Sequence, residues 1–149
     1  MLSISVEEFL IWKKRQLSKG GDQQSFALLL DCIGGISASD LNSMTINLEG
    51  KLYLKKKLEF LESIWDDHLL KSCPIQYLCG ITFWRDLKLK VTNKVLIPRS
   101  ETELIVDIVF NIFPRKSEKL FFAELGTGSG AISIALALAY PFSLSLIHI

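Results

Sequence analysis

Excess charge of one sign, paired cysteines and histidine clusters are all missing from this sequence. Its 17 Lys and Arg residues nearly equal its 16 Asp and Glu residues, which leaves a formal net charge of +1. This balance gives no general electrostatic reason to expect nucleic-acid binding. The 3 cysteines lack the close paired spacing of a zinc site, and His68 has no second histidine or cysteine at ligand spacing. We therefore predict reduced thiols, no metal site and a cytoplasmic location.

A secretion signal and a membrane-spanning run are missing as well. Charged residues such as Glu7 and Lys13 interrupt residues 1–17, where a signal peptide would be apolar. Residues 131–149 are largely apolar, but Pro141 and the neighbouring serines break the run of about 20 apolar residues that a span needs. With 49% hydrophobic and 22% charged residues, the chain has the composition of a globular protein. Its 149 residues suffice for one domain, or for a small domain and the start of another.

Residues 1–72 are predicted to form a bundle of helices only. Ser5 and Glu8 have the spacing of a capping box, which predicts a helix that ends near residues 20–21, a glycine pair. Asp22 can cap a second helix, which a further glycine pair at 34–35 closes. Ser37 and Asp40 are predicted to begin a short third helix.

The longest helix of this bundle is predicted over residues 51–70. Apolar residues recur there at spacings of three and four, which places them on one helix face: Leu54, Leu58, Leu61, Trp65 and Leu69.

A connecting segment with a β-hairpin is predicted over residues 73–98. Leu87, Leu89 and Val91 alternate with lysines in the period of a half-buried strand. A turn at residues 93–94 is expected to lead into a short extended run at 95–97, after which Pro98 discourages further pairing.

The next predicted elements are a helix and a buried strand. Ser100 and Glu103 form another capping box, and apolar residues continue from there until Pro114 ends the helix. Residues 120–123 are a short apolar run, which is typical of a strand buried on both faces of a parallel sheet.

A glycine loop follows this strand and carries the most informative motif. Residues 124–130 read E-L-G-T-G-S-G, and an apolar helix is predicted over 131–139. Glycines at alternating positions let the backbone turn sharply and approach a ligand, while amides at the helix start face it. The unit therefore predicts a site for a nucleotide-like cofactor.

Three interpretations of this loop differ in the ligand. With Ala131 the run also satisfies the G-x-G-x-x-G/A dinucleotide fingerprint, and a tight turn without any ligand is a further alternative. A carboxylate at Glu124, two residues before the first glycine, suits a cofactor whose methionine end carries an ammonium group better than it suits a pyrophosphate. We therefore favour S-adenosylmethionine.

Four blocks in order resemble the peptide chain release factor glutamine methyltransferases. They read P-I-Q-Y-L-C-G at 74–80, F-W at 83–84, V-L-I-P-R-S-E-T-E at 95–103, and the loop at 124–130. The resemblance covers about residues 74–139, and the preceding helices agree only in architecture. Two departures are visible, since the family usually has proline at Ser100 and more often aspartate at Glu124.

The resemblance implies an α/β protein: an amino-terminal all-α helical bundle, followed by the start of a class I, Rossmann-like methyltransferase domain that is truncated. Residues 1–72 would be a helical substrate-docking domain, 73–98 the connecting hairpin, and 99–149 the start of the S-adenosylmethionine-binding domain. The implied reaction is methyl transfer to the side-chain amide of the glutamine in the G-G-Q motif of release factors. The implied cofactor-binding residues are Arg99, Thr102, Glu124, Gly126, Thr127, Gly128, Ser129 and Gly130.

The implied partner is a peptide chain release factor, and we expect a cytoplasmic monomer without direct nucleic-acid or membrane contacts. No catalytic residue is assigned, because the family's N-P-P-Y motif and its acidic residue after a second strand are absent here. Residues 144–149 do not resemble the family and match a translated transposon end used in sequencing libraries, so we interpret them as artefactual. We expect the fragment itself to be inactive. Methylation of a ribosomal-protein glutamine, or a non-catalytic docking role, are the alternatives.

Overall fold

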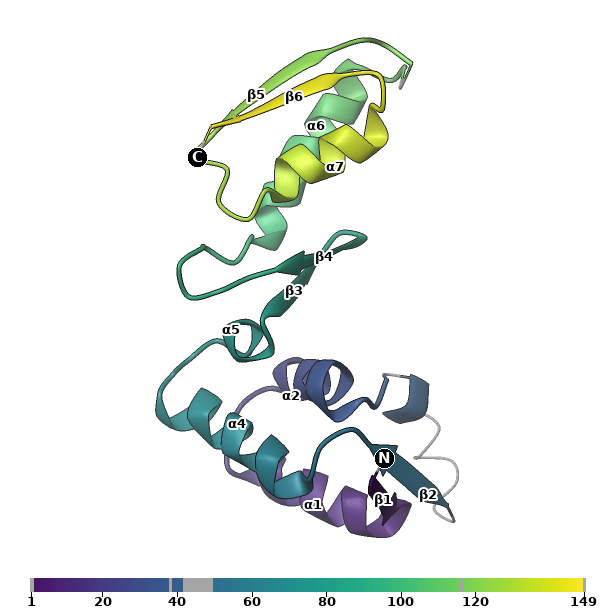
Figure 1. Ribbon diagram of the computed structural model, residues 1–149, viewed down its shortest axis with the longest axis vertical. Helices are drawn as coiled ribbons and strands as arrows, with labels where there is room; N and C mark the ends of the chain where they lie inside the picture. Colours follow the sequence, from purple (N-terminus) through teal and green to yellow (C-terminus); the bar gives the residue numbers. More distant parts are fainter. Residues whose placement is uncertain (1, 38, 42–49, 116, 149) are drawn as a thin grey trace. The chain divides into compact units, whose positions relative to one another are not determined.

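The computed structural model describes residues 2–37, 39–41, 50–115 and 117–148, and it divides into two compact units, 1–79 and 80–149 (Figure 1). The mixed α/β class is confirmed, because both units combine helices with a small sheet. The division between Cys79 and Gly80 places the hairpin with the second unit, whereas the sequence had assigned it to a connecting segment at 73–98.

The capped helices of unit 1 form where the sequence predicts them. Helix α1 spans Val6–Ser18, and the Ser5 hydroxyl accepts a hydrogen bond from the Glu8 amide at 3.2 Å. Helix α2 spans Gln23–Leu29 and continues into a π-helical turn, η1, at Leu30–Gly34. Asp22 caps α2 by accepting from the Ser25 amide at 2.8 Å. Both predicted caps are therefore confirmed. Each is a hydrogen bond across only three residues, which is why the local sequence could indicate it.

The predicted third helix is only partly described. The Ser37 amide donates to Asp40 Oδ2 at 2.8 Å, and the Asp40 amide donates to the Ser37 hydroxyl at 3.2 Å. This reciprocal pair is the predicted capping box, and residues 39–41 are helical. The rest of the predicted helix falls on residues 42–49, which lie outside the described residues.

The prediction of one helix over residues 51–70 is wrong, and so is the all-helical reading of residues 1–72. Strand β2, Lys51–Leu54, pairs antiparallel with strand β1, Leu2–Ser5, and helix α4 spans only Leu58–Leu70. Residues 51–54 also have the alternating period of a strand, because Lys51 and Tyr53 are exposed whereas Leu52 and Leu54 are more buried. A partner strand about fifty residues away decides between the two periods.

Unit 1 has a continuous core of its own. Helix α5, Ile75–Cys79, closes the unit against α2 and α4. The Trp65 indole lies fully buried at the centre, where Nε1 donates to the Gln16 carbonyl at 3.2 Å. The buried apolar residues of this core are Val6, Phe9, Trp12, Phe26, Leu29, Leu30, Ile36, Leu54, Leu61, Trp65 and Ile75.

Unit 2 begins with the predicted hairpin. Strand β3, Ile81–Trp84, pairs antiparallel with β4, Leu87–Lys90, in a register that sets Trp84 opposite Leu87. Arg85 in the turn between them has a left-handed φ of 49°. Residues 95–97 follow without joining a sheet, which differs from the predicted extended pairing.

Helix α6 begins later than the sequence predicts. It spans Glu103–Ile112 and is preceded by a 3₁₀ turn, η2, at Ser100–Thr102. The capping box at Ser100 is therefore wrong: Ser100 already lies inside the turn, where the Thr102 amide donates to the Arg99 carbonyl at 3.1 Å. The Ser100 hydroxyl instead lies near the Glu101 carboxylate at 3.4 Å.

A parallel β-α-β unit completes the fold. Strand β5, Phe121–Leu125, leads through the glycine loop into helix α7, Ala131–Ala139, and strand β6, Leu144–His148, returns parallel to β5 (Figure 1). The segment that departs from the family thus forms a second strand, with the Leu144 amide bonded to the Leu120 carbonyl at 3.0 Å.

The expected two-sided burial of β5 is wrong. Phe121 and Leu125 are each 81% exposed, because the described chain supplies one neighbouring strand and helices that cover one face.

Candidate functional site

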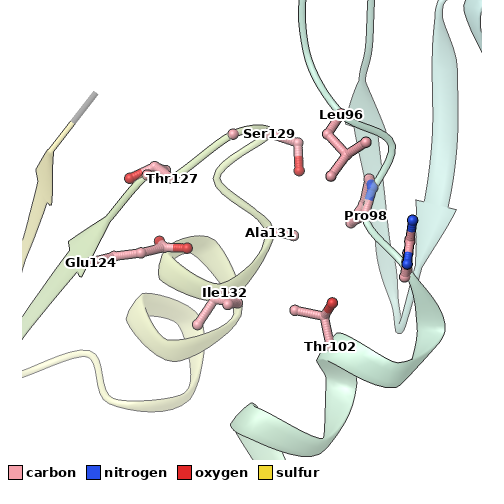
Figure 2. Close-up of a pocket in the computed structure, with 11 residues that line it drawn as sticks. Leu96, Pro98, Thr102, Glu124, Thr127, Ser129, Ala131 and Ile132 are labelled. Atoms are coloured by element: carbon pink, nitrogen blue, oxygen red, sulfur yellow. The ribbon is translucent and has the colours of Figure 1, made fainter.

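A pocket of about 330 Å³ opens in unit 2 beside the glycine loop (Figure 2). Two segments line it: one runs from residue 96 into the 3₁₀ turn, and the other runs from the end of β5 into α7. Figure 2 shows Leu96, Pro98 and Thr102 on one side, and Thr127, Ser129 and Ala131 on the other. The volume falls within the range of about 300–1,000 Å³ that is usual for small-molecule sites.

The glycine loop forms one wall of the pocket, and its backbone adopts a conformation that residues with a Cβ rarely adopt. Gly126, Gly128 and Gly130 all have left-handed φ values, at 70°, 58° and 77°. A Cβ placed on Gly126 would meet no atom within 4 Å. Glycine is thus required there by the backbone and not by crowding, which leaves room for a ligand close to the main chain.

Glu124 lines the pocket at the end of β5 and also caps the following helix. Its Oε2 accepts a hydrogen bond from the Ser133 amide at 3.1 Å and a second one from the Ser133 hydroxyl. Ser133 is only 3% exposed, so this contact ties β5 to the first turn of α7. A carboxylate at a helix N-terminus is favourable because the amides there carry partial positive charge. A carboxylate offers about four acceptor positions, so the two bonds from Ser133 leave capacity for a ligand's ammonium group.

The opposite wall is held by the β-hairpin. The Trp84 indole Nε1 donates to the Arg99 carbonyl at 2.9 Å. The neighbouring Arg85 guanidinium donates to the Glu103 carbonyl at 3.2 Å and to Asp107 Oδ1 at 2.8 Å. These bonds attach the turn that carries Arg99 and the start of α6 to the hairpin.

Most of the residues predicted for cofactor binding meet in this pocket. Those that line it are Arg99, Thr102, Glu124, Gly126, Thr127, Gly128 and Ser129. Gly130 lies next to it as the N-cap of α7. Their cofactor role stays a prediction, while their proximity is a property of the fold.

Four further lining residues were not among the predicted ones. Leu96 and Pro98 belong to the L-I-P-R block, so the motif contained a signal for them. Ala131 and Ile132 are the first residues of α7. Only their position after the last glycine could have indicated that they line the pocket.

The arrangement suits an organic ligand held by main chain and apolar surface. Within the part of the chain that the structure describes, His, Cys, Asp and Glu side chains nowhere gather in a group of three or more that could hold a metal ion. No helix in the described ranges is long and apolar enough to cross a lipid bilayer.

Comparison with known proteins finds several relatives that share one name. The chain is 44% identical over 126 residues to the release factor glutamine methyltransferase of Prochlorococcus marinus, an alignment that covers 84% of this chain and 43% of that protein. It is 35% identical over 137 residues to the protein of the same name from Synechocystis, with 85% of this chain and 44% of the relative covered. The corresponding protein of Gloeobacter violaceus is 34% identical over 122 residues, covering 79% and 41%.

The similarity extends across both units but not across the whole relatives. The chain spans less than half the length of each of these curated relatives. No protein-family model matches the chain.

Proposed function

The chain belongs to the family of the release factor glutamine methyltransferases, and on that premise we propose that the pocket beside the glycine loop binds S-adenosylmethionine. The whole protein would transfer the methyl group to the side-chain amide nitrogen of the glutamine in the G-G-Q motif of a release factor. The observation that carries the proposal is the convergence of Glu124 and the left-handed glycines on one pocket.

The residues of the pocket suit the two ends of this cofactor. The Glu124 carboxylate matches the ammonium group of the methionine end by charge. Gly126 and Gly128 allow close approach of a ligand to the backbone, since a Cβ on either would meet at most one atom, at 4.0 Å. Leu96, Pro98 and Ile132 offer apolar surface for an aromatic ring.

S-adenosylmethionine supplies a methyl group on a positively charged sulfur. A glutamine amide nitrogen is a weak nucleophile, so the reaction depends on holding it in line with that methyl group and on hydrogen bonds to the amide. In this chain the pocket residues would perform the first task, because they fix the cofactor on the backbone of the glycine loop and against residues 96–102.

Unit 1 is proposed to dock the release factor. All residues that line the pocket lie in unit 2, whereas unit 1 has its own core and a separate fold. A self-contained unit that does not line the pocket suits a role in holding the protein substrate. The same separation supports the second candidate, in which this chain docks a partner without catalysing transfer.

Equilibrium dialysis with radiolabelled S-adenosylmethionine tests the cofactor assignment through a matched pair of glycines. Gly126 and Gly80 have φ values of 70° and 71°, and a Cβ on either would meet no atom within 4 Å. Gly126→Ala and Gly80→Ala therefore introduce similar backbone strain, but only the first lies in the pocket. We expect Gly126→Ala to weaken binding by roughly tenfold or more while Gly80→Ala binds like the wild type. Equal affinities in all three proteins would contradict the assignment.

A transfer assay separates the candidate activities. The whole protein and this chain are each incubated with radiolabelled S-adenosylmethionine and either a release factor or isolated ribosomal proteins. Label on the release-factor glutamine supports the proposed reaction, and label on a ribosomal-protein glutamine supports the alternative substrate. A release factor that is bound but stays unlabelled supports the docking role of this chain.

A further inference from the structure

The hydrogen bond between Trp84 and Arg99 carries an inference about how the pocket keeps its shape. We propose that Trp84 is a positioning residue, whose indole N–H fixes the wall formed by residues 96–102 and so prepares the pocket for its ligand. The inference rests on the proposed cofactor role of the pocket and adds to it a residue outside the pocket's lining.

The wall itself has little support from secondary structure. Residues 95–99 belong to no strand or helix, so no ladder of backbone bonds sets their path. The Arg99 carbonyl is the point where this segment turns into η2. It accepts two hydrogen bonds, one from the Thr102 amide at 3.1 Å and one from Trp84 Nε1 at 2.9 Å. The first bond closes the turn, and the second attaches the turn to the hairpin.

Trp84 is a rigid support for this bond. It ends β3, is 2% exposed, and belongs to the core cluster of unit 2 together with Val106 and Ala131. A buried indole in a packed cluster has few alternative orientations, so its N–H points at a defined place. Arg85 supplies a second attachment one residue later, to the Glu103 carbonyl and the Asp107 carboxylate.

The consequence for binding is a matter of preorganisation. A wall that is already held in place loses little freedom when a ligand arrives, whereas a loose wall must be ordered at the expense of affinity. Removal of the indole N–H should therefore loosen residues 96–102 and weaken binding, without changing a residue that touches the ligand.

Two tryptophans make a matched pair for the test. Trp84→Phe and Trp65→Phe each remove one indole N–H bond to a backbone carbonyl, at 2.9 Å and 3.2 Å, and both side chains are almost fully buried. Trp65 lies in unit 1, and the pocket is lined by unit 2 alone. Both variants should lose similar stability, but only Trp84→Phe should affect the pocket. Replacement of Trp84 by β-(3-benzothienyl)alanine removes the N–H donor and keeps the ring shape, which guards against a packing defect.

The measurements are the dissociation constant for S-adenosylmethionine and the hydrogen-exchange rates of the amides in residues 99–103. For both Trp84 variants we expect about three- to tenfold weaker binding and about three- to tenfold faster exchange of the Thr102 amide. Trp65→Phe should match the wild type in both. Wild-type binding and wild-type Thr102 exchange in the Trp84 variants would overturn the inference. If the wild-type protein binds no S-adenosylmethionine and the Trp84 variants still exchange the Thr102 amide faster, the positioning role is supported and the proposed cofactor is overturned instead.

Discussion

The two units differ in how they use their apolar residues. In unit 1 the aromatic side chains of the core are buried against one another: Phe26 is 1% exposed, and its ring meets that of Trp65 edge to face with centroids 4.9 Å apart. In unit 2 large apolar residues lie at the surface, with Phe121 and Leu125 each 81% exposed. Unit 2 also has a core, which contains Trp84, Val106 and Tyr140, but more of its large apolar residues are exposed and it alone lines the pocket. The proposed ligand site therefore lies in the unit with the smaller buried core.

The largest effect should come from the centre of unit 1. Trp65→Ala removes a fully buried indole together with its hydrogen bond to the Gln16 carbonyl. We expect a loss of about 3–5 kcal/mol in the free energy of unfolding, because the surrounding core cannot fill the cavity. Urea denaturation followed by tryptophan fluorescence measures it. A loss below about 1 kcal/mol would show that the core is not the main support of unit 1.

Two glycines, one in each unit, differ in the space around their Cβ positions. Gly21 in unit 1 has a φ of 82°, and a Cβ there would lie 2.5 Å from Cζ2 of Trp65. Gly126 in unit 2 has a similar φ but open space around its Cβ position. Gly21→Ala should cost about 2–4 kcal/mol through strain and overpacking, and Gly126→Ala only about 1–2 kcal/mol through strain. Thermal unfolding of both variants checks the order, and equal losses would remove the distinction between a packing glycine and a pocket glycine.

Two serines test the capping difference at a smaller scale. The Ser5 hydroxyl caps α1, whereas the Ser100 hydroxyl makes no cap bond to η2. Ser5→Ala should lower stability by about 1 kcal/mol, and Ser100→Ala should stay within about 0.5 kcal/mol of the wild type. Denaturant titrations of both variants and the wild type measure these changes in the free energy of unfolding. A larger loss for Ser100→Ala would restore the capping box that the sequence predicts.

The smallest expected effect is on the pH dependence of unit 1. Hydrogen bonds from the Ser25 amide and hydroxyl lower the pKa of Asp22 below its ordinary value of 3.8. Because the folded-state pKa is lowered, the stabilising contribution is present above the ordinary value and is lost as the pH falls through the lowered one. Asp22→Asn should therefore flatten the decline in stability below about pH 4. Unfolding curves at several pH values between neutrality and pH 2 measure this, and parallel declines in both proteins would contradict it.

Most of the helix caps were predictable from the local sequence, with Ser100 as the exception, whereas distant contacts were not predictable. Ser5 and Asp22 cap their helices through bonds that span three residues, so the local pattern contains them. The pairing of Ser5 with Lys51 joins residues far apart in the chain. The pattern at residues 51–54 fitted a helix and a strand alike, and only the partner strand distinguishes them.

The same limit applies to the pocket. The glycine loop was readable because its strand, loop and helix are consecutive. The opposite wall was indicated only by the resemblance of the L-I-P-R-S-E-T-E block to the family. The bonds from Trp84 to Arg99 and from Ser133 to Glu124 depend on how elements pack, and no spacing in the sequence announces them.

We propose that S-adenosylmethionine binds between residues 96–102 and 124–132. The most direct measurement is a titration of the ¹⁵N-labelled wild-type chain with S-adenosylmethionine, followed by amide chemical shifts. We predict saturable shifts concentrated on the glycine loop, the first turn of α7 and the residues around Arg99. The absence of shifts at saturating concentration, or shifts concentrated in unit 1, would contradict it.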